Sequence, residues 1–128
     1  MSPFISMVEV NNLTQRKVDK KLLKGVAKKV LKGENKKELG LSVVLVGQAR
    51  IRELNRKYRR KNKATDVLSF QYDDYGEVVI CLKEVRKNAE RFGSAFQKEL
   101  NRVLIHGILH ILGYGHKKME KRQNYYLT

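Results

Sequence analysis

The chain has 128 residues, of which 41% are hydrophobic, and its 28 Lys and Arg against 13 Asp and Glu give a formal net charge of +15. This length predicts a single domain, residues 1–128, with a real core, and no apolar run approaches the ~20 residues that cross a bilayer. The opening MSPFISMVEV lacks the charge-then-apolar order of a signal peptide, and the one cysteine, Cys81, excludes an internal disulfide, so we expect a cytoplasmic protein with no membrane association.

The first half of the chain predicts two strand–helix units. An apolar stretch over residues 4–10 indicates a strand, and Thr14 is expected to cap a helix whose apolar residues recur every four positions. Gly33 is expected to end that helix. The β-branched run 41–46 has the length of a strand, and a second, basic helix follows Gly47.

The second half predicts two strands joined by a turn, followed by helices. The strands are expected at 67–70 and 78–82, with a turn at 73–76 between them. The helices are expected at 84–92 and 95–112, with a short terminal helix at 119–126. This order predicts an α+β fold with a four-stranded mixed sheet covered by helices.

The positive charge is concentrated in two segments. Residues 14–39 hold ten basic and three acidic side chains, and residues 50–63 hold eight and one, so each carries a formal net +7. A chain this basic is attracted to polyanions, of which nucleic acid is the commonest in a cytoplasm; the alternative is a charged surface that only keeps the protein soluble. The absence of Trp and the modest aromatic content disfavour a base-stacking platform of the RRM type.

All three histidines fall within one short window. His106 and His110 are four residues apart on a predicted helix, so both imidazoles project from one face, and Gly113 can turn the chain so that His116 approaches them. Three imidazoles with an open fourth position are the arrangement of catalytic zinc. Because residues 103–112 are apolar on every side, we expect the helix and its two imidazoles to be buried. The alternative is a set of core histidines bonded to backbone carbonyls.

The spacing also matches the metzincin protease pattern H-E-x-x-H-x-x-G-x-x-H at every position but one. Gly107 stands where that pattern has the glutamate that takes a proton from the zinc-bound water. The pattern therefore keeps the metal site and disfavours peptide hydrolysis by the usual route.

The histidine window is similar to the H-G-x-L-H-L-x-G-Y-D-H signature of the YbeY family of endoribonucleases. Residues 54–70, LNRKYRRKNKATDVLSF, resemble the family block L-N-x-x-Y-R-x-K-D-K-P-T-D-V-L-S-F, and residues 76–80, GEVVI, resemble its G-D-[LIV]-V-I strand. Three positions depart from the family pattern. Ala64 and Gln71 replace prolines, and Gly115 replaces the aspartate before the third histidine.

The resemblance implies a zincin-like single domain whose metal site lies on the long C-terminal helix and the turn after it. It implies that His106, His110 and His116 bind one Zn²⁺, with other divalent transition metals as alternatives, and that Arg59 acts in catalysis. An arginine suits this role because its planar guanidinium can bind a phosphate through two hydrogen bonds and stabilise charge on phosphorus. A solvent-exposed Arg59 without a catalytic role is the alternative.

The resemblance further implies a single-strand-specific, metal-dependent endoribonuclease that acts in 16S rRNA 3′-end maturation and ribosome quality control. The expected partners are the 16S rRNA precursor and the small ribosomal subunit, and we expect a monomer. Two other functions remain open at this point. One is a metalloprotease-like hydrolase with an atypical base, and the other is a non-catalytic ribosome-assembly factor with a structural metal.

Overall fold

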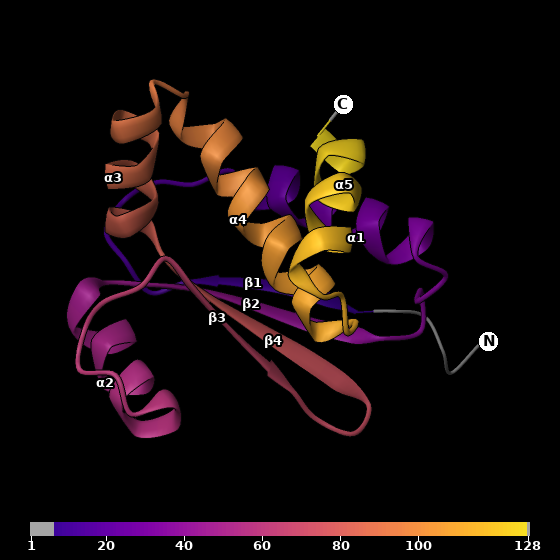
Figure 1. The fold of residues 1–128 in the computed structure, drawn as a ribbon, viewed down its shortest axis with the longest axis horizontal. Helices are drawn as coiled ribbons and strands as arrows, with labels where there is room; N and C mark the ends of the chain where they lie inside the picture. Colours follow the sequence, from indigo (N-terminus) through magenta and orange to yellow (C-terminus); the bar gives the residue numbers. More distant parts are fainter. Residues whose placement is uncertain (1–6, 128) are drawn as a thin grey trace.

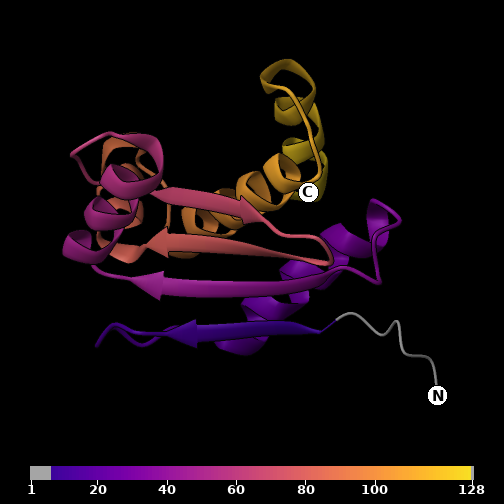
Figure 2. The same ribbon diagram turned by 90° about the horizontal axis from the view of Figure 1, so that it is seen from below.

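The computed structural model describes residues 7–127, which form a four-stranded sheet with helices on both faces (Figure 1). Three strands run parallel: β1 (Val8–Asn12), β2 (Gly40–Val46) and β4 (Tyr75–Cys81). The strand β3 (Val67–Gln71) pairs antiparallel with β4, and the order β1-β2-β4-β3 leaves β3 at one edge (Figure 2). The predicted mixed four-stranded sheet is confirmed.

The helices divide unequally between the two faces of the sheet. Four helices lie on one face: α1 (Lys20–Gly33), α3 (Leu82–Phe92), α4 (Phe96–Ile111) and α5 (His116–Leu127). The helix α2 (Gln48–Arg59) lies on the other face (Figure 1). None of the helices within residues 7–127 combines the length and the apolar character that a membrane crossing requires.

The sheet separates two hydrophobic cores because successive side chains of a strand point to opposite faces. In β4, Val78 and Ile80 join the larger core with α4, whereas Val79 and Cys81 join a smaller core beneath Ile51 of α2. Both faces of β4 are therefore covered over residues 78–81, which explains the continuous apolar run in that part of the strand.

The first helix begins later than the sequence predicts. Asp19, not Thr14, is the N-cap of α1, and its carboxylate accepts a hydrogen bond of 3.0 Å from the backbone of Leu22. The Thr14 hydroxyl instead donates to the side chain of Asn12 at 2.6 Å and accepts from the backbone of Arg16, so it stabilises the turn after β1. The prediction of Thr14 as the cap was wrong because this local turn uses its hydroxyl.

Other boundaries shift by a few residues. The strand predicted at 4–10 is found at Val8–Asn12, and residues 4–6 lie outside the described part of the chain. The terminal helix is longer than expected and begins at His116. Gly113 has a φ of +90°, as its predicted helix-ending role requires, whereas Asn35, with a φ of +62°, is the left-handed residue after α1.

The helix α4 approaches the sheet most closely at Gly107. A Cβ atom at this position would lie 2.7 Å from Cγ1 of Val78 and 3.2 Å from the hydroxyl oxygen of Ser69. That hydroxyl donates a 2.9 Å hydrogen bond to the backbone carbonyl of Gly107. Position 107 therefore faces the sheet and has no room for a side chain, so it could not hold the carboxylate of a metzincin protease.

Replacing Gly107 by Ala is expected to destabilise the fold by about 1–3 kcal/mol, because the new methyl group overlaps a buried Val78 on a central strand. Gly25, also inside a helix but with no atom within 4 Å of its would-be Cβ, is the matched control. Gly25→Ala should stabilise the protein by about 0.5–1 kcal/mol. Urea unfolding of both variants measures the two effects, and equal shifts of the same sign would contradict this packing.

Candidate metal centre

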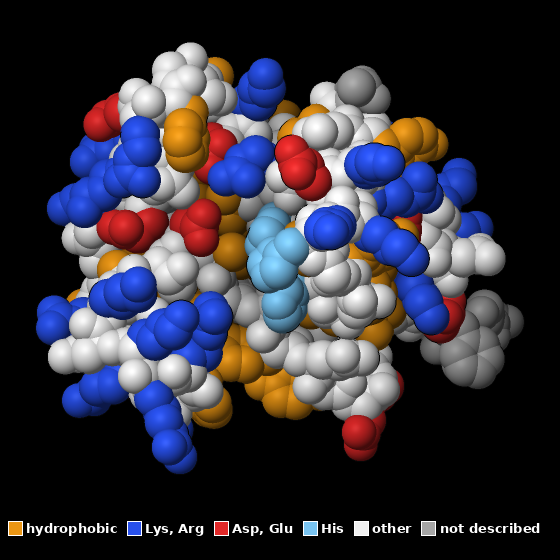
Figure 3. Space-filling model, viewed as in Figure 1, with side chains coloured by type: hydrophobic (Ala, Val, Ile, Leu, Met, Phe, Trp, Pro, Cys, Tyr) orange, Lys and Arg blue, Asp and Glu red, His pale blue; other side chains and the backbone are white. Residues whose placement is uncertain are grey.

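One cavity of about 510 Å³ brings together the three histidines and the predicted arginine. It is lined by His106, His110 and His116, by Tyr58 and Arg59 of α2, and by residues 67–70 of β3. Because β3 is an edge strand, the cavity wraps around a free sheet edge, with α4 on one face and α2 on the other. In Figure 3 the histidines form a cluster in the middle of this face of the molecule.

The histidines are more accessible than the sequence predicts. His106 is half-buried, whereas His110 and His116 are exposed. The expectation of two buried imidazoles was therefore wrong for His110. The apolar residues of α4 pack on the sheet and on α1 and α5, but the side of the helix that carries the histidines lines the cavity together with residues 67–70 of β3.

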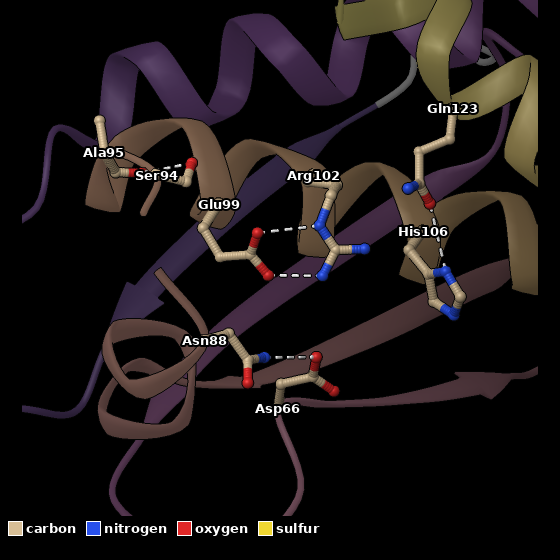
Figure 4. Close-up of polar contacts among 8 residues, drawn as sticks. All are labelled: Asp66, Asn88, Ser94, Ala95, Glu99, Arg102, His106 and Gln123. Atoms are coloured by element: carbon tan, nitrogen blue, oxygen red, sulfur yellow. Dashed lines mark hydrogen bonds and ion pairs between the residues drawn. The ribbon is translucent and has the colours of Figure 1, made fainter. Parts of the chain in front are cut away.

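The ring of His106 is oriented by Gln123 of α5. Its Nδ1 lies 3.2 Å from the amide oxygen of Gln123, a buried side chain (Figure 4). An amide oxygen can only accept a hydrogen bond, so the contact places the proton on Nδ1 and leaves the lone pair on Nε2. Burial lowers the pKa of His106, although the hydrogen bond to Gln123 acts in the opposite direction. The lowered pKa favours the neutral ring. A neutral imidazole with a fixed tautomer is the form that binds metals.

The acidic side chains near His106 are already engaged with other partners. Glu99 is buried and accepts two hydrogen bonds from the guanidinium of Arg102, one helical turn before His106 on the same side of α4 (Figure 4). Asp66 accepts a 3.2 Å hydrogen bond from the side-chain amide of Asn88. Among residues 7–127, no carboxylate lines the cavity, so imidazole is the donor that these residues offer to a metal.

Arg59 is the last residue of α2 and is held at the cavity by the loop that follows. Arg60 adopts a left-handed conformation, with a φ of 58°. The side-chain NH₂ group of the buried Asn55 donates to the backbone carbonyl of Lys63 at 2.9 Å. The backbone carbonyl of Asn55 accepts a hydrogen bond from the backbone N–H of Lys61. Arg59 itself makes no ion pair with any carboxylate of residues 7–127, so its guanidinium is available to an anion.

The turn before His116, together with α5, is tied to the end of α1 through Glu34. The hydroxyls of Tyr114 and Tyr126 and the guanidinium of Arg122, the last at 2.7 Å, all donate to its carboxylate. Burial alone would raise the pKa of Glu34, but these three donors outweigh it and hold the pKa below its ordinary value. Burial and the bond to Glu34 raise the pKa of Tyr126 to about 12.

The three imidazoles that line the cavity are suitable metal ligands, although their rings do not lie close enough together to bind one ion. As the side chains lie, no three His, Cys, Asp or Glu residues between 7 and 127 are close enough to hold one ion. Three imidazoles nevertheless face one cavity, and one of them has its tautomer fixed from behind. His110 and His116 are exposed, and exposed side chains change rotamer readily.

Three residues that support the site were not predicted. Gln123 lies two helical turns after His116 and thus on the same side of α5, which is the one sequence signal that it carried. Asn55 lies within the block that resembles the family. Glu34 carries no signal, because its partners are about 80 or more residues away in the chain.

The mixed sheet, the covering helices and this cavity define a small α+β domain with a candidate site lined by three imidazoles. Residues 9–126 match the family described as "Endoribonuclease YbeY". The chain therefore belongs to the YbeY family.

Individual relatives agree with this assignment. Endoribonuclease YbeY of Persephonella marina is 41% identical, with the alignment covering 85% of this chain and 77% of that protein. Endoribonuclease YbeY of Aquifex aeolicus is 36% identical over 91% of this chain and 87% of the relative. The solution structure of the Thermotoga maritima protein TM1509 is similar with a TM-score of 0.72 and 34% identity, covering 94% of this chain and 87% of that one.

Replacing Glu34 by Ala is expected to lower the free energy of unfolding by about 1–3 kcal/mol, because three donors lose their acceptor. Since the folded-state pKa of Glu34 is depressed, its contribution is present above the ordinary value of 4.5 and is lost as the pH falls below it. Urea unfolding at neutral and acid pH should show a difference from wild type that shrinks in acid. The exposed Glu38→Ala is the control, and a Glu34 variant as stable as this control would contradict the network.

Proposed function

We propose that this chain is a metal-dependent endoribonuclease that cuts single-stranded RNA at the cavity around the β3 edge. The observation that carries the proposal is that His106, His110 and His116 share one cavity with Arg59, although these residues come from three different helices. Membership of the YbeY family, whose members bear the name endoribonuclease, supplies the reaction.

The three imidazoles would hold one Zn²⁺ ion. Binding one ion would require the exposed His110 and His116 side chains to rotate toward His106, whose ring is held by Gln123. When bound, a zinc ion supplies a Lewis acid for a phosphate oxygen and lowers the pKa of water. Gln123 fixes the proton on Nδ1 of His106, and the Glu34 network holds the turn before His116.

Arg59 stabilises negative charge on the phosphate that is being cut. Arg59 lines the cavity and makes no ion pair with a carboxylate of residues 7–127, and its fork can bind two phosphate oxygens. The basic residues of α2 and of the loop after it attract the rest of the RNA backbone. These residues bind and orient the substrate, and Arg59 acts on the reacting phosphate.

The biological substrate is the 16S rRNA precursor, on which a cytoplasmic, monomeric enzyme acts at the small ribosomal subunit during 3′-end maturation and quality control. The similarity to the YbeY relatives and the net charge of +15 support this part of the proposal. The packing of Gly107 against the sheet counts against the peptidase alternative. The accessible position of His110 and His116 counts against a closed, purely structural metal site.

The direct test is incubation of the zinc-loaded protein with a single-stranded RNA, its matched duplex and an unstructured peptide. We expect cleavage of the single-stranded RNA and no cleavage of the peptide. Cleavage of the peptide, or intact RNA at every zinc concentration, would overturn the proposal.

Replacing His110 by Ala is expected to abolish the binding of about one zinc ion per chain, because two imidazoles alone make a weak site. The control is Cys81→Ala, which removes the one thiol of the chain, buried on the opposite face of the sheet. That variant should keep its zinc. Elemental analysis of the dialysed proteins measures the number of zinc ions per chain. Full zinc content in the His110 variant would exclude the proposed ligand set.

Replacing Arg59 by Ala is expected to slow RNA cleavage by ~10²-fold, as for other groups that stabilise transition-state charge, while the zinc content stays unchanged. Arg59→Lys should recover little of the rate, because a point charge does not reproduce the guanidinium fork. Arg56→Ala on the same helix removes the same charge outside the cavity and should leave the rate nearly unchanged. Equal rates for the Arg59 and Arg56 variants would show that Arg59 has no catalytic role.

A further inference from the structure

Four aromatic side chains, in two contacting pairs, form a strip beside the candidate metal centre. The aromatic strip consists of Tyr58 of α2, Phe70 of β3, and Tyr72 and Tyr75 of the β3–β4 hairpin. The rings of Tyr58 and Phe70 meet edge to face with centroids 5.2 Å apart, and those of Tyr72 and Tyr75 stack at 4.5 Å.

The strip begins in the cavity and ends at the hairpin. Tyr58 and Phe70 line the cavity that holds the histidines. Tyr72 directly follows β3, and its backbone N–H donates to the carbonyl of Tyr75 at 2.8 Å, which extends the pairing of β3 with β4 by one residue. Tyr72 is therefore expected on the same face as Phe70, the face that α2 covers. Partial burial and the nearby Glu77, Tyr75 and Tyr58 all raise the pKa of Tyr72.

The strip is open to solvent, and positive charge flanks it. Tyr58, Tyr72 and Tyr75 are 57%, 45% and 42% exposed, which is unusual for three neighbouring aromatic residues. The ammonium group of Lys57 lies 5.3 Å from the centre of the Tyr58 ring. Figure 3 shows a hydrophobic patch below the histidines, bordered by the Lys and Arg side chains over α2.

We propose that the aromatic strip is a stacking surface for unpaired RNA bases next to the cleaved phosphate, and so the part of the site that selects single strands. The inference rests on the proposed function. Phosphates would follow the basic helix α2, and bases would turn inward onto Tyr72 and Tyr75 and then onto the cavity aromatics. Aromatic faces bind any base whose own face is free, whereas the bases of a duplex are already stacked on each other.

Charge complementarity favours RNA over a protein as the occupant. The segment 50–63, which contains α2 and borders the strip, carries a formal net +7. An apolar protein partner would have to bury these charges, whereas the phosphates of RNA neutralise them. Exposed aromatic rings bordered by basic side chains are typical of surfaces that bind single-stranded nucleic acid without sequence preference.

The test replaces the two hairpin residues together, Tyr72→Leu and Tyr75→Leu, which keeps an apolar side chain and removes the stacking ring. Both lie outside the cavity lining, so the proposed metal and phosphate contacts are untouched. Phe92→Leu is the matched control, because Phe92 is an equally exposed aromatic residue (62%) at the end of α3. A short fluorescent single-stranded RNA, the same strand in a duplex, and an abasic ribose-phosphate strand of equal length are the probes, with chelator present to prevent cleavage.

The double variant should bind the single-stranded RNA at least about tenfold more weakly than wild type, since each stacked base contributes substantially to affinity. Its affinities for the duplex and for the abasic strand should not change, and Phe92→Leu should bind all three probes like wild type. An unchanged affinity for single-stranded RNA would overturn the inference, as would an equal loss for all three probes.

The same experiment separates the inference from the proposed function. If the wild-type protein binds single-stranded RNA through the strip but never cuts it with zinc, the proposed function fails and the stacking surface stands. If the wild-type protein cuts the RNA and the hairpin variant loses no affinity, the stacking surface fails alone. If a protein and not RNA binds the strip, the variant loses that partner while its RNA affinity is unchanged, which also overturns the inference.

Discussion

The contact between α4 and the sheet at Gly107 determines where the rest of the site lies. Because this position carries no side chain, the helix backbone rests against Val78 and receives a hydrogen bond from Ser69. His106 precedes Gly107, and His110 follows one turn after His106, so both are held beside the β3 edge. A bulkier residue would lift α4 away from the strand that lines the same cavity, and the distance between the histidines and Arg59 would grow.

Three polar contacts then support the individual parts of the site. Gln123 orients His106 from α5, Glu34 ties the turn before His116 to α1, and Asn55 fixes the loop after Arg59. The first two contacts join segments that are far apart in the chain, and the third binds a loop to the helix that precedes it. The arrangement concentrates structural support around a cavity at which Arg59, His110 and His116 stay exposed, and this combination suits a site that must open to a polymer.

The sequence predicted the elements whose signals are local. The four-residue period of the first helix, the β-branched run before Gly47 and the spacing of the histidines each lie within a few turns of chain, and the mixed sheet followed from them. Properties set by distant residues were not predictable. The exposure of His110 depends on where the edge strand ends, and the closeness of Gly107 to Val78 joins positions far apart in the chain. Thr14 and Asp19 are both good cap residues, and the neighbouring turn at Asn12 decided between them.

The proposed function requires the three histidines to act as one metal site, and the nuclear magnetic resonance signals of their imidazoles can test this requirement. The chain has three histidines, so a long-range ¹H–¹⁵N spectrum contains three imidazole signals, each of which reports its own tautomer. On titration with zinc, a single site shared by the three imidazoles predicts that all three signals change together and that the change is complete at about one equivalent. An imidazole whose signal does not move at saturation, or three independent changes at different zinc concentrations, would contradict it.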